Sequence, residues 1–126
     1  MNVVGLMSGT SADGVDAALV TIARQKAGLR VEMIAFHSLS YPRSLQQRIL
    51  SASVSGTVTD ICHLNAFLGE WFADAALGVI RSAQLSPEDV DLIGSHGQTV
   101  HHLPHGIKDT GVGAIRSTLQ IAEPAV

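Results

Sequence analysis

The stretch Val3-Val-Gly-Leu-Met-Ser-Gly-Thr-Ser-Ala-Asp-Gly-Val-Asp16 decides the fold of this 126-residue chain. A short apolar run stops at Gly9, and the β-rich run Val15 to Ile22 follows, which predicts a strand, a tight turn and a second strand. The pair Asp13-Gly14 is also an ordinary hairpin signal. A hairpin needs only two turn residues, whereas six small or polar residues stand between these strands. The length of the turn therefore favours a binding function.

The chemistry of this turn predicts a site for ATP with magnesium. Glycines let backbone N–H groups approach an anion, and the hydroxyls of Thr10 and Ser11 can donate to phosphate oxygens. The carboxylates of Asp13 and Asp16 can hold a metal ion directly or through water.

Composition indicates one globular domain and excludes several partners. A chain of 126 residues with 46% hydrophobic residues can bury a core, but it has no room for a second lobe of similar size. The formal net charge is -3 and no Lys/Arg cluster is present, so the sequence lacks the basic surface that would attract nucleic acid or an anionic membrane. No apolar run approaches the roughly 18 residues that span a bilayer.

The single cysteine, Cys62, has no partner for an internal disulfide. Its place in an apolar helical pattern predicts a buried free thiol in a reducing compartment. The first residues lack the basic region of a secretion signal. These features predict a cytoplasmic protein.

The remaining chain alternates between strand and helix patterns. The alternating run Leu29 to Phe36 predicts a half-buried third strand, antiparallel to the second. Apolar residues at helical spacing predict a short helix over Ser44 to Ala52. A long helix is predicted to begin at its cap, Asp60, and to carry an apolar stripe that ends at Ile80. Short strands are expected at Asp91 to Ser95 and Ser117 to Ile121. This order predicts an α/β fold with a mixed sheet that starts with three antiparallel strands and is flanked by helices.

A second constellation lies in the segment Gly94 to His105, which holds four of the six histidines. A histidine metal site and a plain polar loop are two possible interpretations, although structural zinc sites favour paired ligands and no Cys or carboxylate joins this segment. The third is a ligand-binding loop at the carboxyl end of a strand. There His96, Gln98 and Thr99 offer donors and acceptors suited to the hydroxyls and amides of a sugar. One loop would hold the phosphoryl donor and the other the acceptor.

With both loops considered, the sequence resembles the amino-terminal part of the bacterial anhydro-N-acetylmuramic acid kinases, which belong to the superfamily of sugar kinases, heat-shock chaperones and actin. The matching stretches are Gly5 to Ala18, Gly94 to Pro104 and Ser117 to Ala125. The resemblance implies a ribonuclease H-like, actin-like ATPase lobe. It also implies cleavage of the 1,6-anhydro bridge by water and phosphorylation of the 6-oxygen by ATP, a step of peptidoglycan recycling.

The resemblance also implies roles for individual residues. The nucleotide loop would comprise Gly9, Thr10, Ser11, Ala12, Asp13, Gly14, Val15 and Asp16. Asp13 and Asp16 would lie toward magnesium. His96, Gln98 and Thr99 would line the sugar pocket, with Glu123 near it. Ser8 would stand behind the loop.

Two departures from the family pattern concern the carboxyl-terminal end. Ala122 stands where the family usually has glycine. The chain ends among apolar residues, so we expect residues 1–126 to be the amino-terminal lobe of a two-lobe kinase, inactive alone and dimeric when full length. The catalytic aspartate would then follow Val126. The alternative is a non-catalytic, actin-like domain that binds nucleotide or a partner protein.

Overall fold

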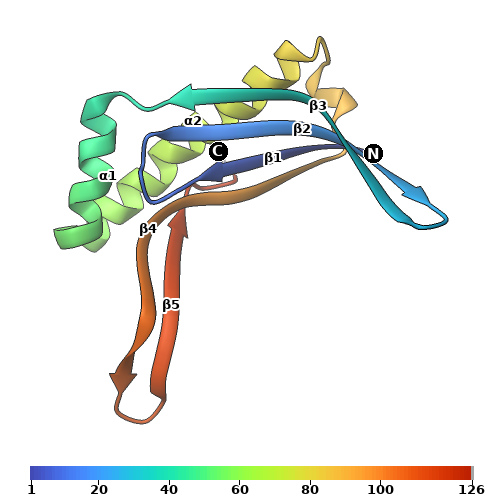
Figure 1. Ribbon diagram of the computed structural model, residues 1–126. Helices are drawn as coiled ribbons and strands as arrows, with labels where there is room; N and C mark the ends of the chain where they lie inside the picture. Colours follow the sequence, from blue (N-terminus) through green and yellow to red (C-terminus); the bar gives the residue numbers. More distant parts are fainter. Residues whose placement is uncertain (126) are drawn as a thin grey trace.

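The computed structural model describes residues 1–125. Its elements, in chain order, are β1 (Asn2–Ser8), β2 (Gly14–Gln25), β3 (Gly28–Ser40), α1 (Arg43–Ser55), α2 (Val58–Ser82), a 3-10 turn η1 (Pro87–Asp89), β4 (Leu92–Asp109) and β5 (Gly113–Ile121). The strands form one sheet in the order β3-β2-β1-β4-β5 (Figure 1).

The sheet is mixed, as predicted. β1 pairs antiparallel with β2, and β2 antiparallel with β3, whereas β4 runs parallel to β1 and β5 antiparallel to β4. A parallel neighbour requires a crossover, and α1 and α2 provide it. This confirms the α/β fold that begins with three antiparallel strands, the arrangement expected of an actin-like ATPase lobe.

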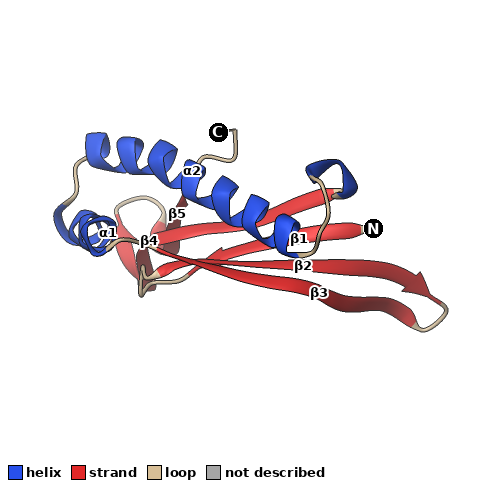
Figure 2. Ribbon diagram, turned by 90° about the horizontal axis from the view of Figure 1, so that it is seen from above, coloured by secondary structure: helices blue, strands red, loops and turns tan. Residues whose placement is uncertain are grey.

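Helix α2 crosses one face of the sheet and builds the core there (Figure 2). Alternate residues of β1 and β2 point toward the helix, and apolar residues on one face of α2 pack against them. The buried contributors include Val4, Leu6, Val15, Ala17, Leu19, Leu64, Leu68, Phe72, Ala76 and Val79. Each large aliphatic or aromatic side chain of this kind contributes about 1.5–3 kcal/mol when it leaves water.

The start of α2 differs from the prediction. The N-cap is Thr57, not Asp60, which is the third helical residue. The two form a capping box, in which Thr57 Oγ1 accepts from the Asp60 N–H and an Asp60 carboxylate oxygen accepts from the Thr57 N–H. The Asp60 carboxylate also accepts from the Thr57 hydroxyl at 2.7 Å, and this bond, followed by that from the Thr57 N–H, lowers the pKa of Asp60. Cys62 is exposed, contrary to the predicted buried thiol, because it lies on the face of α2 opposite to the buried Leu64 and Leu68.

The opposite face of the sheet carries no helix within residues 1–125 (Figure 2). Met7 is 49% exposed there and Phe36, which pairs with Ala18, is 57% exposed. The β2–β3 hairpin also projects beyond the rest of the sheet (Figure 1). Leu29, Val31 and Met33 are exposed on it, so the prediction that this strand is half-buried throughout is wrong. No helix of the described residues is long and apolar enough to cross a membrane.

The histidine-rich segment is not a loop. It lies inside β4, which bends away from the sheet and pairs with β5 in a projecting arm (Figure 1). The bend begins at an irregularity in the β1–β4 register, where Leu6 pairs with Ser95 but Ser8 with Gln98. Gly97 occupies it at φ +73, and a Cβ there would come within 2.7 Å of the Ile121 carbonyl oxygen. Only glycine fits this position without a shift of the backbone.

Candidate functional site

Most carbonyl oxygens of the turn between β1 and β2 accept hydrogen bonds from the rest of the protein. Four of these oxygens accept hydrogen bonds from other elements: Gly9 from Gln98 Nε2 (2.7 Å), Ser11 from Gln46 Nε2 (3.1 Å), Asp13 from the Tyr41 N–H (2.9 Å) and Gly14 from Ser8 Oγ (2.6 Å). The donors come from β4, α1, the β3–α1 connection and β1. The turn is therefore held from four sides through its acceptors.

The donor side of the same turn is open. Within residues 1–125, the backbone N–H groups of Thr10, Ser11 and Asp13 have no hydrogen-bond acceptor, and all three residues are exposed. The N–H and C=O of one peptide point in opposite directions, so holding the Gly9 carbonyl inward turns the Thr10 N–H outward. A Cβ added to Gly9 would meet no atom within 4 Å, so the backbone is bare on this side. Such a set of free N–H groups fits an anion.

Two residues of the predicted nucleotide loop contribute backbone only. The side chains of Ala12 and Val15 are 1% and 0% exposed and belong to the core. Ala12 has φ +49, and its N–H closes the turn on the Gly9 oxygen at 3.2 Å. Its buried methyl group anchors the turn from below.

The two predicted magnesium ligands are exposed carboxylates. Asp13 accepts from the Ser11 hydroxyl at 2.9 Å, and Asp16, on β2, accepts from the Ser38 hydroxyl at 2.7 Å. Mg²⁺ commonly keeps several waters and takes one or two carboxylates together with substrate phosphates. The residues present fit that mode. Among the described residues, no group of three or more His, Cys, Asp or Glu side chains is placed to hold a metal ion.

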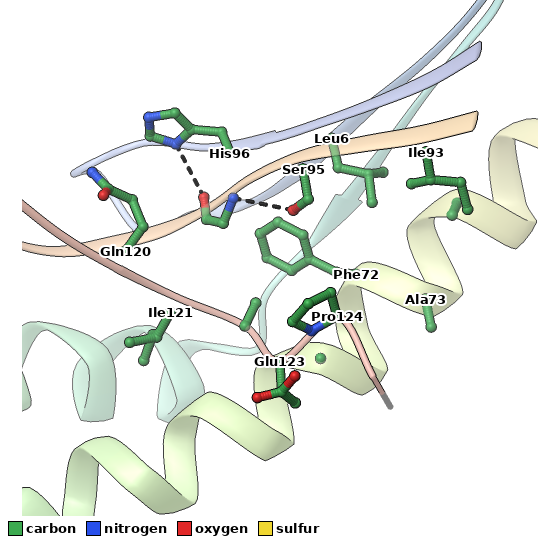
Figure 3. A pocket seen from close by; sticks show the side chains of 14 residues that line it. Leu6, Phe72, Ala73, Ile93, Ser95, His96, Gln120, Ile121, Glu123 and Pro124 are labelled. Carbon is green, nitrogen blue, oxygen red and sulfur yellow. Dashed lines mark hydrogen bonds between the residues drawn. The ribbon is translucent and has the colours of Figure 1, made fainter.

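A cavity of about 490 Å³ lies between α2 and the bend of β4 and end of β5 (Figure 3). Phe72 and Ile121 supply apolar walls, and Ser95, His96 and Glu123 supply polar groups. Nδ1 of His96 lies 3.2 Å from the Gly97 carbonyl oxygen, a contact that is a hydrogen bond in the tautomer with the proton on Nδ1. Nε2 of the same ring is then an acceptor.

The structure brings two of the four predicted sugar residues together. His96 and Glu123 line this cavity, whereas Thr99 is half-buried beyond it. Gln98 is 0% exposed. Its amide nitrogen donates to Gly9 and Thr99 carbonyl oxygens at 2.7 and 3.0 Å, and its oxygen accepts from Ser8 Oγ at 2.7 Å. The polar atoms of the Gln98 side chain are thus engaged inside the protein, and the side chain is not accessible to a ligand.

Sequence reasoning missed two residues around the site, Asn65 and Tyr41. Asn65 of α2 accepts from the Ala122 N–H and donates to Glu123, at 3.0 and 3.3 Å, and so fixes the cavity wall. Tyr41 packs edge-on against Trp71. Burial raises the pKa of Tyr41 to about 12, the Ser8 hydroxyl partly opposing this, and the buried hydroxyl makes no hydrogen bond of ordinary geometry. The Ser8–Gln98 contact could be predicted only once the register of β1 against β4 was known, because that register places the two residues side by side.

Known proteins match the whole of the chain. The profile of the anhydro-N-acetylmuramic acid kinase family matches residues 1–126. A protein named anhydro-N-acetylmuramic acid kinase from Caldanaerobacter subterraneus subsp. tengcongensis is 53% identical over 98% of this chain. Proteins of the same name from Bacillus cereus and Bacillus thuringiensis are 47% and 46% identical over all of it. The chain spans 32% of the length of each of these relatives.

Proposed function

The chain belongs to the anhydro-N-acetylmuramic acid kinase family, and on that premise we propose that the protein containing it is an ATP-dependent sugar kinase. The reaction opens the 1,6-anhydro ring of anhydro-N-acetylmuramic acid with water and transfers the γ-phosphoryl group to O6. The observation that carries the proposal is the Gly9–Gly14 turn, in which four carbonyl oxygens are hydrogen-bonded to other elements while the N–H groups of Thr10, Ser11 and Asp13 have no acceptor among residues 1–125. The free N–H groups suit the oxygens of a polyphosphate.

In this proposal the turn binds the phosphates of ATP. The bare backbone at Gly9 permits close approach, and the hydroxyls of Thr10 and Ser11 add donors. Asp13 and Asp16 hold magnesium, directly or through water; the ion, when bound, offsets the charge that develops on the transferred phosphoryl group. The side chains of Ala12 and Val15 keep the turn seated on the core.

The sugar would occupy the cavity beside the β4 bend. Nε2 of His96, the Ser95 hydroxyl and the Glu123 carboxylate offer acceptors and a donor for sugar hydroxyls, and Phe72 offers an apolar wall. Thr99 lies three residues after His96 on β4, outside the lining of this cavity.

The rest of the kinase would complete the site. Phosphoryl transfer needs donor and acceptor aligned in a cleft that excludes water, and residues 1–126 form one wall of it. We propose that these residues are the amino-terminal lobe, that the catalytic base lies in the other two thirds of the relatives' length, and that the enzyme is a cytoplasmic homodimer. The exposed Met7 and Phe36 on the open sheet face support a further layer of chain there.

Incubating the complete protein with ATP, magnesium and anhydro-N-acetylmuramic acid tests the proposal. The expected product is the 6-phosphate of the opened sugar, detected by mass spectrometry, with none formed by residues 1–126 alone. ATP binding without sugar binding or turnover would instead identify a non-catalytic nucleotide-binding domain. Absence of both ATP binding and turnover would refute the kinase assignment altogether.

A further inference from the structure

We propose that Gln98 is a positioning residue that orients the Gly9–Thr10 peptide for phosphate binding, and that it does not contact the sugar. The inference rests on the proposed function for the identity of the ligand. It assigns to Gln98 a role different from the one that its neighbours in the sequence suggest. Its basis is a set of contacts across 89 residues of sequence.

Gln98 fixes the direction of the Gly9–Thr10 peptide group. Gln98 Nε2 donates to the Gly9 carbonyl oxygen at 2.7 Å, the shorter of the two hydrogen bonds which that oxygen accepts. The peptide is planar and trans, so the oxygen and the Thr10 N–H point in opposite directions. By holding the oxygen inward, Gln98 aims the Thr10 N–H at solvent, where the phosphate would lie.

The second step is the rigidity of Gln98 itself. Its oxygen lies 2.7 Å from Ser8 Oγ, whose single proton is shared with the Gly14 carbonyl oxygen, and its second amide proton bonds the Thr99 carbonyl oxygen at 3.0 Å. The side chain is completely buried, so each bond forms without competition from water. A side chain with every polar atom engaged has one orientation, which fixes the direction of its donor.

The third step is the place of Gln98 between two proposed subsites. The preceding residues, His96 and Gly97, line the cavity on β4, while Gln98 points away from it to the turn. A substitution here should therefore act on nucleotide binding and spare the sugar. Gln98→Met is suited to the test because it keeps the length of the side chain, and of the three groups that Gln98 contacts only the Thr99 carbonyl oxygen loses its hydrogen-bond partner. The Gly9 oxygen retains the Ala12 N–H and the Ser8 hydroxyl retains the Gly14 oxygen.

The experiment compares wild type, Gln98→Met and the matched control Gln47→Met, an exposed glutamine of α1, all in the complete protein. Calorimetry measures the dissociation constants of ATP with magnesium and of anhydro-N-acetylmuramic acid separately. Hydrogen exchange follows residues 9–14 without ligand. We expect Gln98→Met to weaken ATP binding by about tenfold, which corresponds to the loss of one well-placed hydrogen bond. Exchange in the turn should speed up, and sugar affinity and the Gln47→Met protein should stay within about twofold of wild type.

Three outcomes would overturn the assignment: weaker sugar binding with unchanged ATP binding, unchanged binding of both, or an equal loss of both together with a lower melting temperature. Failure of the wild-type protein to bind ATP would refute the proposed function instead. In that case the exchange rates decide on Gln98 alone, and unchanged exchange at residues 9–14 would show that it does not hold the turn.

Discussion

The side-chain oxygen of Asn65, on helix α2, accepts a hydrogen bond from the backbone N–H of Ala122 over 3.0 Å. Ala122 has φ +117, a conformation that side-chain-bearing residues rarely adopt. The Glu123 N–H donates to the Asn65 backbone oxygen at 2.9 Å, so one helical residue holds two consecutive peptides after β5. The two hydrogen bonds hold Ala122 in this conformation.

Ala122→Gly should stabilise the protein by about 1 kcal/mol, because relief of strain at positive φ exceeds the added entropy of the unfolded chain. Thermal unfolding of the complete protein should show an apparent Tm about 2 °C higher. The matched control is Ala66→Gly on an exposed part of α2, where the same change should lower Tm. A decrease for both variants would show that Ala122 is not strained.

Gly9→Ala should weaken ATP binding by about tenfold without loss of stability. The added methyl group meets no protein atom within 4 Å, so only a ligand close to the backbone would collide with it. KM for ATP and the melting temperature separate the two effects. Gly97→Ala, with φ +73 and a 2.7 Å contact, should instead lose stability. Unchanged ATP kinetics in Gly9→Ala would place the phosphates elsewhere.

Asp13→Asn should lower kcat by about a hundredfold while the melting temperature stays near that of wild type. The amide oxygen still accepts from the Ser11 hydroxyl, so the turn keeps its internal hydrogen bond, but the charge that would hold magnesium is gone. Steady-state kinetics at saturating magnesium measure the loss, with Asp74→Asn on the exposed side of α2 as the control. If turnover and stability fell together, the carboxylate would be architectural.

Tyr41→Phe should remove a pH dependence of stability. Burial raises the pKa of Tyr41 to about 12 from 10.0, so the folded protein keeps the phenol proton that the unfolded chain releases. Stability is therefore complete below pH 10 and falls by roughly 2 kcal/mol as the pH rises toward 12. At neutral pH the substitution should be neutral or slightly stabilising, because the buried hydroxyl has no hydrogen-bond partner of ordinary geometry among residues 1–125. Denaturation across this pH range is the measurement, and an identical alkaline loss in Tyr41→Phe would assign the effect to another group.

Local patterns were enough to predict the sheet order of the first strands and the helical core. The small residues of the turn marked its place, because strand and turn signals are written in neighbouring residues. The role of Gln98 was not predictable in this way, since its partners Ser8 and Gly9 lie about ninety residues away and become neighbours only through the parallel pairing of β1 with β4. Polar residues such as His101 and His102 resembled a loop, yet they pair with β5 in an exposed arm where either face tolerates polarity.

Phosphate binding by the Gly9–Gly14 turn is tested most directly by an ATP·Mg²⁺ titration of the isotopically labelled complete protein, followed through its backbone amide resonances. We predict that the amide resonances of Thr10, Ser11 and Asp13 shift most and saturate together, because their free N–H groups bond to phosphate oxygens. Saturable ATP binding that leaves these three resonances in place would contradict it.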